Sequence, residues 1–357
     1  MADQKLSELT INNAVLGTDS RLYSVVDPSG SPLAGYTKYE SIRDQISSYI
    51  GGAGNPLDNL LWVAKNGNDT TGDGSSGKPY LTITKALTEI TTAGQTILVA
   101  PGTYTETLTF TQNDTAIIGQ QGSGGQQEVI ITQTNTNVVD FGTTSRCVVG
   151  TCNIQLTAAA STIYAVIIGA SGSGKIRFCR TETICTTGGI LAGIGYSAGG
   201  ELVFAHGKVF QTNNVDGDGS EIKAAFRISN GSTLKLSDVK EIDVNTDGSS
   251  DHSVIASDEG TSGTIIMESC REANINDDDA DCTVLLLLTG SSSSHRFRYN
   301  EARVNKSITN PGDGIGICLP SGSCKIHTAF NHMRIGQTSG AGYSFKLASG
   351  TEATWRT

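Results

Sequence analysis

In the second half of the chain, carboxylates recur at a spacing that could bring them together in space. Hydrolysis of a glycosidic bond uses two carboxyl groups about 5–10 Å apart, one as a general acid and the other as a nucleophile or base. Glu241 and Asp243 lie about 30 residues before Glu272, which is the length of the repeat described below. Carboxylates are so frequent here that some must coincide by chance, so we predict no catalytic residue and keep this trio as an alternative.

The segment Gly169–Lys175 follows the apolar residues Val166–Ile168 and is similar to a phosphate-binding loop. Its next residue is Ile176, where such a loop needs the hydroxyl of Ser or Thr to hold magnesium. A strand pattern then follows, where the phosphates would need the N-terminus of a helix. We therefore interpret the segment as a glycine-rich turn.

Two acidic segments, Asp216–Glu221 and Asp277–Asp281, could supply oxygen ligands to a cation. The first begins like an EF-hand loop, but it has Glu221 where Gly is required and Arg227 where a bidentate Glu is required. A looser oxygen site is the alternative to two solvated acidic turns, and we predict no metal and no cofactor. The histidines are scattered without a repeated partner, so they support no Ser–His–Asp arrangement: His206, His252, His295, His327 and His332.

Eight cysteines are spread through the chain without a Cys-x-x-Cys pair, and the histidines do not lie beside them at the spacing of zinc ligands. We expect reduced, mostly buried thiols in a protein made in a cytosol, with a disulfide ladder or zinc site as the alternative. These residues are Cys147, Cys152, Cys179, Cys185, Cys270, Cys282, Cys318 and Cys324.

The composition favours short strands and tight turns. The 357 residues include 43 Gly, and Ser, Thr and Asn are abundant, a balance typical of β structure. The net charge is −10 and no run of five or more Lys and Arg occurs, so we expect no nucleic-acid partner. The sequence contains no apolar stretch long enough for a membrane span and starts without a secretory signal pattern, so we expect no membrane partner.

A repeat of about 30 residues begins near residue 160 and predicts the fold. Two apolar residues one position apart recur with a third apolar residue six positions later, and a second strand follows later in each unit. The period of two excludes helical repeats, and a propeller would need longer units. The copies are Ile176, Phe178, Ile184; Leu202, Phe204, Phe210; Leu234, Leu236, Ile242; Ile265, Met267, Ala273; with weaker ones at Phe297, Tyr299, Val304 and at Ile326, Met333.

Each unit of two or three short strands can bury its apolar face only against neighbouring units, as in a solenoid. We predict an all-β chain, a single-stranded right-handed parallel β-helix preceded by a small N-terminal domain. Leu202, Leu234 and Ile265 are expected to stack in one interior ladder, with Phe204, Leu236 and Met267 beside or across from them. The aromatic residues Phe178, Phe204 and Phe210 are also expected in the core, which leaves few exposed aromatic residues to hold a sugar.

The N-terminal region has a different pattern. Residues 39–50 place apolar side chains at i, i+3, i+7, i+10 and i+11, which is typical of one face of a short amphipathic helix. Glycines and a proline between Gly51 and Pro56 end that helix. We therefore predict three regions: an N-terminal domain at 1–50, a linker at 51–59 and the β-helix at 60–357.

The start of the third region resembles the opening of pectate-lyase-like right-handed β-helices. The residues that carry the resemblance are Leu61–Asp69, Gly77–Ile83, Ala86 and Val99–Glu106. They predict strands at Leu61–Ala64, Ile97–Val99 and Leu108–Phe110 and a helix at Thr82–Ile90. The resemblance implies the fold, because this opening occurs on lyases, hydrolases and inert fibres alike. The Lys, Arg and Asp constellation of a calcium-dependent pectate lyase has no counterpart here, so lyase chemistry is not implied.

The N-terminus is similar to the start of many bacteriophage tail or head fibre proteins, in Lys5–Thr10 and Asp19–Val26. In that family a short domain holds the fibre to the virion and the remainder projects outward. The resemblance implies that residues 1–50 anchor the chain in the particle. The residues expected to do so are Lys5, Leu6, Leu9, Leu22, Tyr23, Val25 and Val26.

Together these patterns predict a structural virion protein of a bacteriophage, a fibre or spike assembled in the host cytoplasm. Its expected partners are tail, baseplate or capsid proteins, other copies of the chain in a trimer, and a host-surface glycan. A trimer is expected because a lone β-helix leaves open ends and flat faces that association would cover. The alternatives are a tailspike depolymerase, which would cleave a host polysaccharide, and a capsid decoration protein.

Overall fold

The computed structural model describes residues 21–23, 36–38, 59–121, 127–159, 163–186, 192–214, 222–229, 231–247, 252–258, 262–277, 282–288, 294–298, 300–306, 313–319, 325–329, 332–336, 342–347 and 352–356. The chain divides into two units, Met1–Asn59 and Leu60–Thr357.

In the first unit, the described residues form two short strands. β1 (Arg21–Tyr23) and β2 (Tyr36–Lys38) pair antiparallel, with Leu22 opposite Thr37 and Tyr23 opposite Tyr36. The helix expected at 39–50 lies outside the described residues. The same holds for five of the expected anchoring residues: Lys5, Leu6, Leu9, Val25 and Val26.

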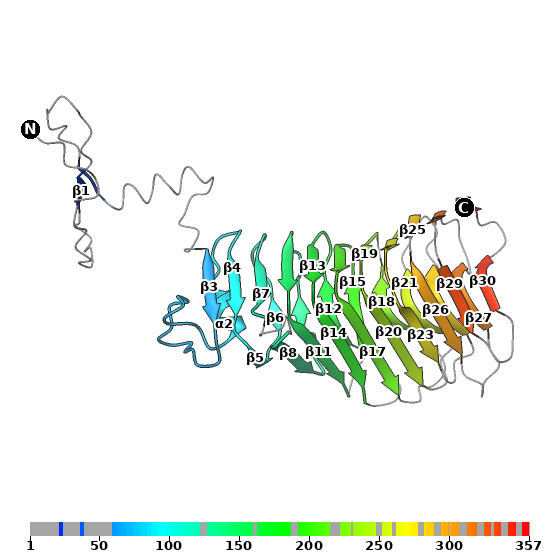
Figure 1. The fold of residues 1–357 in the computed structure, drawn as a ribbon, viewed down its shortest axis with the longest axis horizontal. Helices are drawn as coiled ribbons and strands as arrows, with labels where there is room; N and C mark the ends of the chain where they lie inside the picture. The colour runs from blue at the N-terminus through cyan, green and yellow to red at the C-terminus, as the bar shows by residue number, and fades with distance from the viewer. Residues whose placement is uncertain are drawn as a thin grey trace, which may run out of the picture. The chain divides into compact units, whose positions relative to one another are not determined.

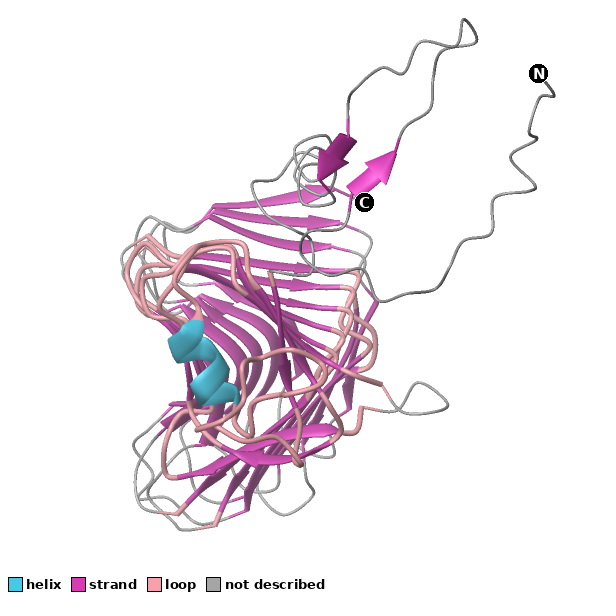
Figure 2. Ribbon diagram, turned by 90° about the vertical axis from the view of Figure 1, so that its left-hand side faces the viewer, coloured by secondary structure: helices cyan, strands magenta, loops and turns pink. Residues whose placement is uncertain are grey.

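The second unit is a parallel β-helix in which three sheets run side by side along one axis (Figures 1 and 2). Each coil adds one strand to each sheet, and each strand pairs in parallel with its counterpart one coil on. Crossovers between parallel strands are almost always right-handed, and the predicted right-handed β-helix is confirmed.

Within the described residues, the first sheet has eleven strands. They are β3 (Leu60–Val63), β4 (Thr96–Val99), β7 (Ala116–Gly119), β10 (Cys147–Gly150), β13 (Ser173–Arg177), β16 (Glu201–Ala205), β19 (Thr233–Ser237), β22 (Thr264–Glu268), β25 (Ser294–Arg298), β28 (Lys325–Ala329) and β31 (Glu352–Arg356).

The second and third sheets have nine described strands each. The second contains β5 (Gly102–Thr105), β8 (Val129–Thr134), β11 (Asn153–Ala158), β14 (Arg180–Cys185), β17 (Lys208–Asn214), β20 (Glu241–Asp247), β23 (Ala273–Asp277), β26 (Glu301–Lys306) and β29 (His332–Gly336). The third contains β6 (Leu108–Thr109), β9 (Val139–Asp140), β12 (Ile163–Ile168), β15 (Ala192–Ser197), β18 (Ile222–Ile228), β21 (His252–Asp258), β24 (Cys282–Leu288), β27 (Asp313–Leu319) and β30 (Gly342–Leu347).

The helix α2 (Ile83–Glu89) lies at the N-terminal end of the β-helix (Figure 2) and confirms the helix predicted at 82–90. Its N-cap is Thr82, whose side chain accepts a hydrogen bond from the backbone of Lys85 at 3.1 Å. The Asp69 carboxylate accepts bonds from the Leu81 amide at 2.7 Å and from the Thr82 amide and hydroxyl. The bond to Lys85 pairs a backbone donor that the first helical turn leaves free, and the bonds to Asp69 hold the two residues that precede α2.

The predicted interior ladder is confirmed. Leu202, Leu234 and Ile265 occupy matching positions in successive strands of the first sheet, and all are buried. Their neighbours Phe204, Leu236 and Met267 form a second ladder in the same register and are also buried. Each coil therefore covers the apolar side chains of the previous one, at roughly 25 cal/mol per Å² of apolar surface removed from water.

In the coil before Leu202, the residues predicted to continue the two interior ladders are the wrong ones. Ile176 pairs with Phe204, and Gly174 occupies the position in line with Leu202. Phe178 and Ile184, expected inside, are 43% and 40% exposed. The reason lies across the core, where the Phe141 ring fills the space beside Gly174, so that a Cβ on Gly174 would lie 2.3 Å from Phe141 Cδ2.

A second error concerns the strand after the corner. Val209, Ile242 and Ala273 form the buried row of the second sheet, so the position expected for Phe210 belongs to Val209. Phe210 lies in register with Asp243 on the outward side of that sheet. Successive side chains in a strand alternate between faces, so a shift of one residue moves a side chain outside.

The corner between the first and second sheets repeats in successive coils with a left-handed backbone. Its residues have φ values between 51° and 58°, and the amide of each donates to a carbonyl of the next coil at 3.0 or 3.1 Å. This conformation is unfavourable for residues other than Gly, Asn and Asp. The five corner residues are Thr151, Phe178, His206, Asp238 and Ser269.

Three cysteines follow corner residues and point into the core. Cys152, Cys179 and Cys270 are buried, and burial raises the pKa of Cys179 and of Cys270 to about 12. Cys147 and Cys185 are buried as well, so the expectation of buried cysteines is confirmed for these five. Cys324 lies outside the described residues.

A buried polar residue continues the first ladder. His295 takes the position in line with Ile265, and its Nδ1 accepts a hydrogen bond from the Ile265 amide at 3.0 Å. The Nε2 atom is 3.5 Å from Oδ2 of Asp258, and both residues are buried. Burial lowers the pKa of His295 to about 4, so the imidazole is neutral at pH 7.

Candidate binding face

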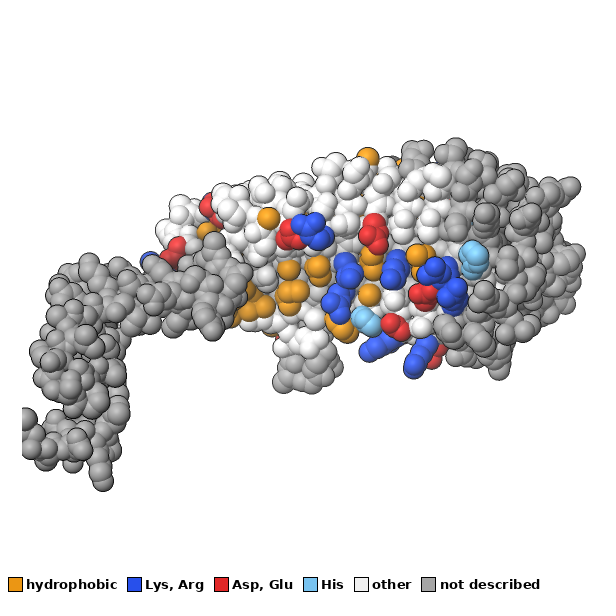
Figure 3. All heavy atoms as spheres, turned by 90° about the horizontal axis from the view of Figure 1, so that it is seen from above, with side chains coloured by type: hydrophobic (Ala, Val, Ile, Leu, Met, Phe, Trp, Pro, Cys, Tyr) orange, Lys and Arg blue, Asp and Glu red, His pale blue; other side chains and the backbone are white. Residues whose placement is uncertain are grey.

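Basic side chains gather on the outward face of the first sheet. In Figure 3, Lys and Arg side chains cover one stretch of the molecule, next to a group of hydrophobic side chains. Register explains the clustering, because Lys175, Val203, Lys235, Ile266 and Arg296 occupy matching outward positions in five successive strands. We call the outward surface of β13, β16, β19 and β22, with the corner that follows these strands, the basic face.

A shallow groove of about 260 Å³ lies on this face, and we call it the basic groove. Lys175 and Lys235 stand on either side of Val203, two strand spacings or about 10 Å apart at their backbones. Neither lysine forms an ion pair with another described residue, so both charges are open to an incoming anion. The groove is lined by Arg146, Cys147, Val148, Ser173, Gly174, Lys175, Glu201, Val203 and Lys235.

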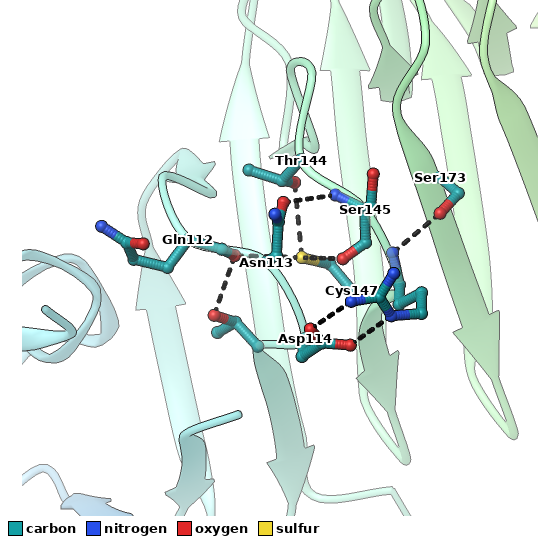
Figure 4. A network of polar contacts seen from close by, with 9 residues as sticks. Gln112, Asn113, Asp114, Thr144, Ser145, Cys147 and Ser173 are labelled. Carbon is teal, nitrogen blue, oxygen red and sulfur yellow. Dashed lines mark hydrogen bonds and ion pairs between the residues drawn. The ribbon is translucent and has the colours of Figure 1, made fainter. Parts of the chain in front are cut away.

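One end of the basic groove is held by a network of polar contacts (Figure 4). The Arg146 guanidinium donates two hydrogen bonds to the Asp114 carboxylate, at 2.5 and 2.6 Å, and this contact lowers the pKa of Asp114. The Arg146 amide donates to the Ser173 hydroxyl at 2.7 Å, and the Ser145 amide to Asn113 Oδ1 at 2.9 Å. Paired Arg–carboxylate bonds fix geometry, so this end is pre-organised.

A second groove, of about 640 Å³, follows the corner between the first and second sheets. We call it the corner groove. Lys208 Nζ is 2.7 Å from Glu241 Oε2, and His206 Nδ1 is 3.9 Å from Asp238 Oδ2. Cations and carboxylates therefore alternate along it. Its lining residues are His206, Lys208, Asp238, Lys240, Glu241, Ser269, Arg271 and Glu272.

The structure brings together the carboxylates that the sequence singled out. Ile242 pairs with Ala273 and the Ile242 amide donates to the Glu272 carbonyl, so Glu241 and Glu272 are neighbours in adjacent coils of the corner groove. Asp243 lies two residues along β20, opposite Asn274. A general acid needs an apolar setting that excludes water. Glu272 is exposed and Glu241 binds the Lys208 ammonium, so neither has that setting.

Two outward aromatic rings lie at the same corner. The Phe178 ring stacks on the His206 ring, with centroids 5.0 Å apart and planes 16° apart. The Arg177 guanidinium is 5.2 Å from the Phe178 centroid, and that of Arg180 is 4.0 Å from the Phe210 centroid. The core positions predicted for Phe178 and Phe210 are therefore wrong, but among the aromatic side chains that the structure describes Phe178 is the exposed one and Phe210 is half-buried.

The remaining candidate segments from the sequence form a turn or lie outside the described residues. The segment Gly169–Lys175 joins β12 to β13 and contributes to β13, which confirms its interpretation as a turn. Asp216–Glu221 and residues 278–281 lie outside the described residues. In the part of the chain that the structure describes, no three His, Cys, Asp or Glu side chains are placed to share a metal ion. The described helix is too short to cross a bilayer.

Sequence analysis missed the cations of the basic face. The sequence has no continuous run of positive charges at these positions, because Lys175 and Arg177 are separated by one residue and Lys235 lies 60 residues after Lys175. They meet because each coil returns the chain to the same face after about 30 residues. The signal that could have found them is a positive charge repeated at the length of the coil, and not a run of charges.

Comparisons with known proteins cover parts of this architecture. The model of a family described as "Protein of unknown function (DUF1565)" matches residues 65–145. No curated protein matches the sequence.

Three solved structures illustrate the likeness. A pectin methylesterase from carrot is 13% identical, covers 83% of this chain and 88% of its own, with a TM-score of 0.46. The pectin methylesterase PemA from Erwinia chrysanthemi is 12% identical over 69% and 80%, with a TM-score of 0.42. A GH136 lacto-N-biosidase from Eubacterium ramulus is 10% identical over 87% and 71%, with a TM-score of 0.28. At these identities the likeness concerns the fold alone.

Proposed function

We propose that this chain is a structural subunit of a bacteriophage particle, a fibre or spike that presents its β-helix and the basic face to the host surface. The observation that carries the binding part is the pair of open cations, Lys175 and Lys235, on either side of Val203 in a chain of net charge −10. The two ammonium groups on either side of the basic groove suit a ligand that supplies the opposite charge.

Support for the particle comes from the sequence. The fibre-like opening, Lys5–Thr10 and Asp19–Val26, precedes a β-helix of stacked coils. In this proposal the first unit joins the virion, copies of the chain associate as a trimer, and the second unit provides a rigid surface. Side chains on strands keep fixed spacings, so such a surface can present charges without any moving part.

The test of the particle assignment is incorporation. Phage expressing a chain without residues 1–59 should assemble particles that lack this subunit, measured by mass spectrometry of purified virions. Circular dichroism and size-exclusion chromatography of the shortened chain are the control, because it must still fold. A folded shortened chain that enters particles at the normal level would contradict the anchor, and absence of the full-length chain from virions would contradict the whole proposal.

A second candidate function is a glycan depolymerase, because Glu241 and Glu272 are neighbours in the corner groove. In that case the purified chain would release reducing ends from host capsule or lipopolysaccharide. The activity would disappear in Glu241→Gln and persist in a control, Glu201→Gln, whose carboxylate lies in the basic groove instead. The structural proposal expects no fragments from either variant or from the unchanged protein.

A further inference from the structure

We propose that the corner around Phe178 is a subsite for an acidic sugar, in which Phe178 stacks on the pyranose while Arg177 and Lys175 bind its carboxylate and that of a neighbouring unit. This inference rests on the proposed binding role of the basic face and adds the chemical class of its ligand. It begins from Phe178, whose ring is exposed beside the cations of the basic face.

Phe178 is set apart from the other corner residues by its exposed ring. Its φ of 53° is shared with them, so the left-handed backbone follows from the path of the chain between the first and second sheets. Its side chain is 43% exposed, so a large part of its apolar surface stays in water. A Gly or Asn at this corner would suit the left-handed backbone and remove the exposed ring. An exposed ring is what a sugar face requires.

The surroundings of Phe178 position it. Its ring stacks on His206 with centroids 5.0 Å apart, and its carbonyl accepts a hydrogen bond from the Gln127 side-chain amide. Gln127 Oε1 in turn accepts from the Arg180 amide at 3.0 Å. Gln127 therefore fixes the backbone at this corner, and His206 holds the ring, so that binding of a ligand costs little side-chain entropy.

The charges beside the ring indicate an acidic ligand. Arg177 and Lys175 are outward residues two positions apart on β13, which places their backbones about 7 Å from each other. Lys235 is a further two strands from Lys175. Neither Arg177 nor Lys175 forms an ion pair among the described residues. A chain with one carboxylate per sugar unit can reach several of these cations at once, and a small single anion cannot.

The acidic residues among the cations favour a sugar over a nucleic acid. Glu201 lines the basic groove and Asp238 lines the corner groove. A carboxylate accepts hydrogen bonds from hydroxyl groups, which every pyranose offers in number. A phosphodiester backbone offers mainly negative charge, so each carboxylate on the face would repel it. A ligand with both hydroxyls and carboxylates fits this mixture.

The experiment measures binding and stability together on the full-length chain. Tetragalacturonic acid is the carboxylated probe, maltotetraose its uncharged counterpart, and a single-stranded oligothymidylate the nucleic-acid probe, each followed by isothermal titration calorimetry. The variants are Phe178→Gly, Phe178→Tyr and Thr151→Gly. Thr151 has the same left-handed corner position one coil before Phe178 and lines neither groove, so Thr151→Gly is the matched control for the backbone change.

We expect tetragalacturonic acid to bind and maltotetraose not to bind. Phe178→Gly should bind the acid about 10-fold more weakly, the loss of one stacked ring, while its unfolding temperature stays the same or rises. Phe178→Tyr and Thr151→Gly should keep the affinity. The inference is overturned if tetragalacturonic acid does not bind, if Phe178→Gly binds like Thr151→Gly, if Phe178→Gly unfolds at a lower temperature, or if oligothymidylate binds equally well. Incorporation into particles is measured separately, so failure here leaves that part of the proposed function standing.

Discussion

The Phe141 ring fills the space that a side chain at residue 174 would occupy, and this gives the coil register a direct test. Phe141 is fully buried, and a Cβ on Gly174 would lie 2.3 Å from its ring. Phe141→Ala should therefore lower the free energy of unfolding by about 3–5 kcal/mol. Gly174→Leu adds a side chain to a filled core and should cost about 1–3 kcal/mol.

The double variant, Phe141→Ala with Gly174→Leu, should be more stable than the sum of the two single changes implies. The new leucine would stand in line with Leu202 and Leu234 and would enter the space that the ring vacates. We expect a favourable coupling free energy of about 1–3 kcal/mol, measured by urea unfolding followed by circular dichroism. If the free-energy costs of the two single changes simply add, the two positions do not share this space. That result would refute the register in which Gly174 lies in line with Leu202.

Three further predictions concern the interior and the helix. Leu234→Ala should lower the free energy of unfolding by about 2–5 kcal/mol, while Lys235→Ala on the outward side should change it by less than about 0.5 kcal/mol, by urea unfolding. Because burial lowers the pKa of His295 from 6.5 to about 4, the folded state binds fewer protons than the unfolded state. About 3 kcal/mol of stability should be lost as the pH falls from 6.5 to 4, and His295→Gln, which does not titrate, should show a smaller loss in pH-dependent unfolding. Asp69→Ala should cost about 1–3 kcal/mol in thermal unfolding, since it leaves the Leu81 and Thr82 amides unpaired just before α2. Stability equal to that of the unchanged protein would contradict this role of Asp69.

The interior ladder could be predicted from the sequence because it depends only on local alternation and a regular repeat. Leu202 and Phe204 alternate with outward residues, and Leu234 and Ile265 follow at nearly constant intervals. Where both conditions hold, the strand period and the coil length determine which side chains meet. The helix at 82–90 could be predicted for the same reason, from its own spacing.

Prediction failed where distant residues decide the register. Phe178 has the same apolar character and spacing as Phe204, but the core beside Gly174 is already filled by Phe141 from the previous coil. Competition for space between residues more than 30 positions apart leaves no mark in a local pattern. The basic face was missed because Lys175 and Lys235 are 60 residues apart in the sequence and two strands apart in the sheet.

The most direct measurement of the central claim is a cryo-electron microscopy map of the intact particle at a resolution that traces this chain. The account predicts that residues 1–50 contact another virion protein, that the β-helices associate as a trimer, and that the surface around Lys175 and Phe178 is open to solvent. A map in which that surface is covered by another virion protein, or in which the chain is absent from the particle, would contradict the account.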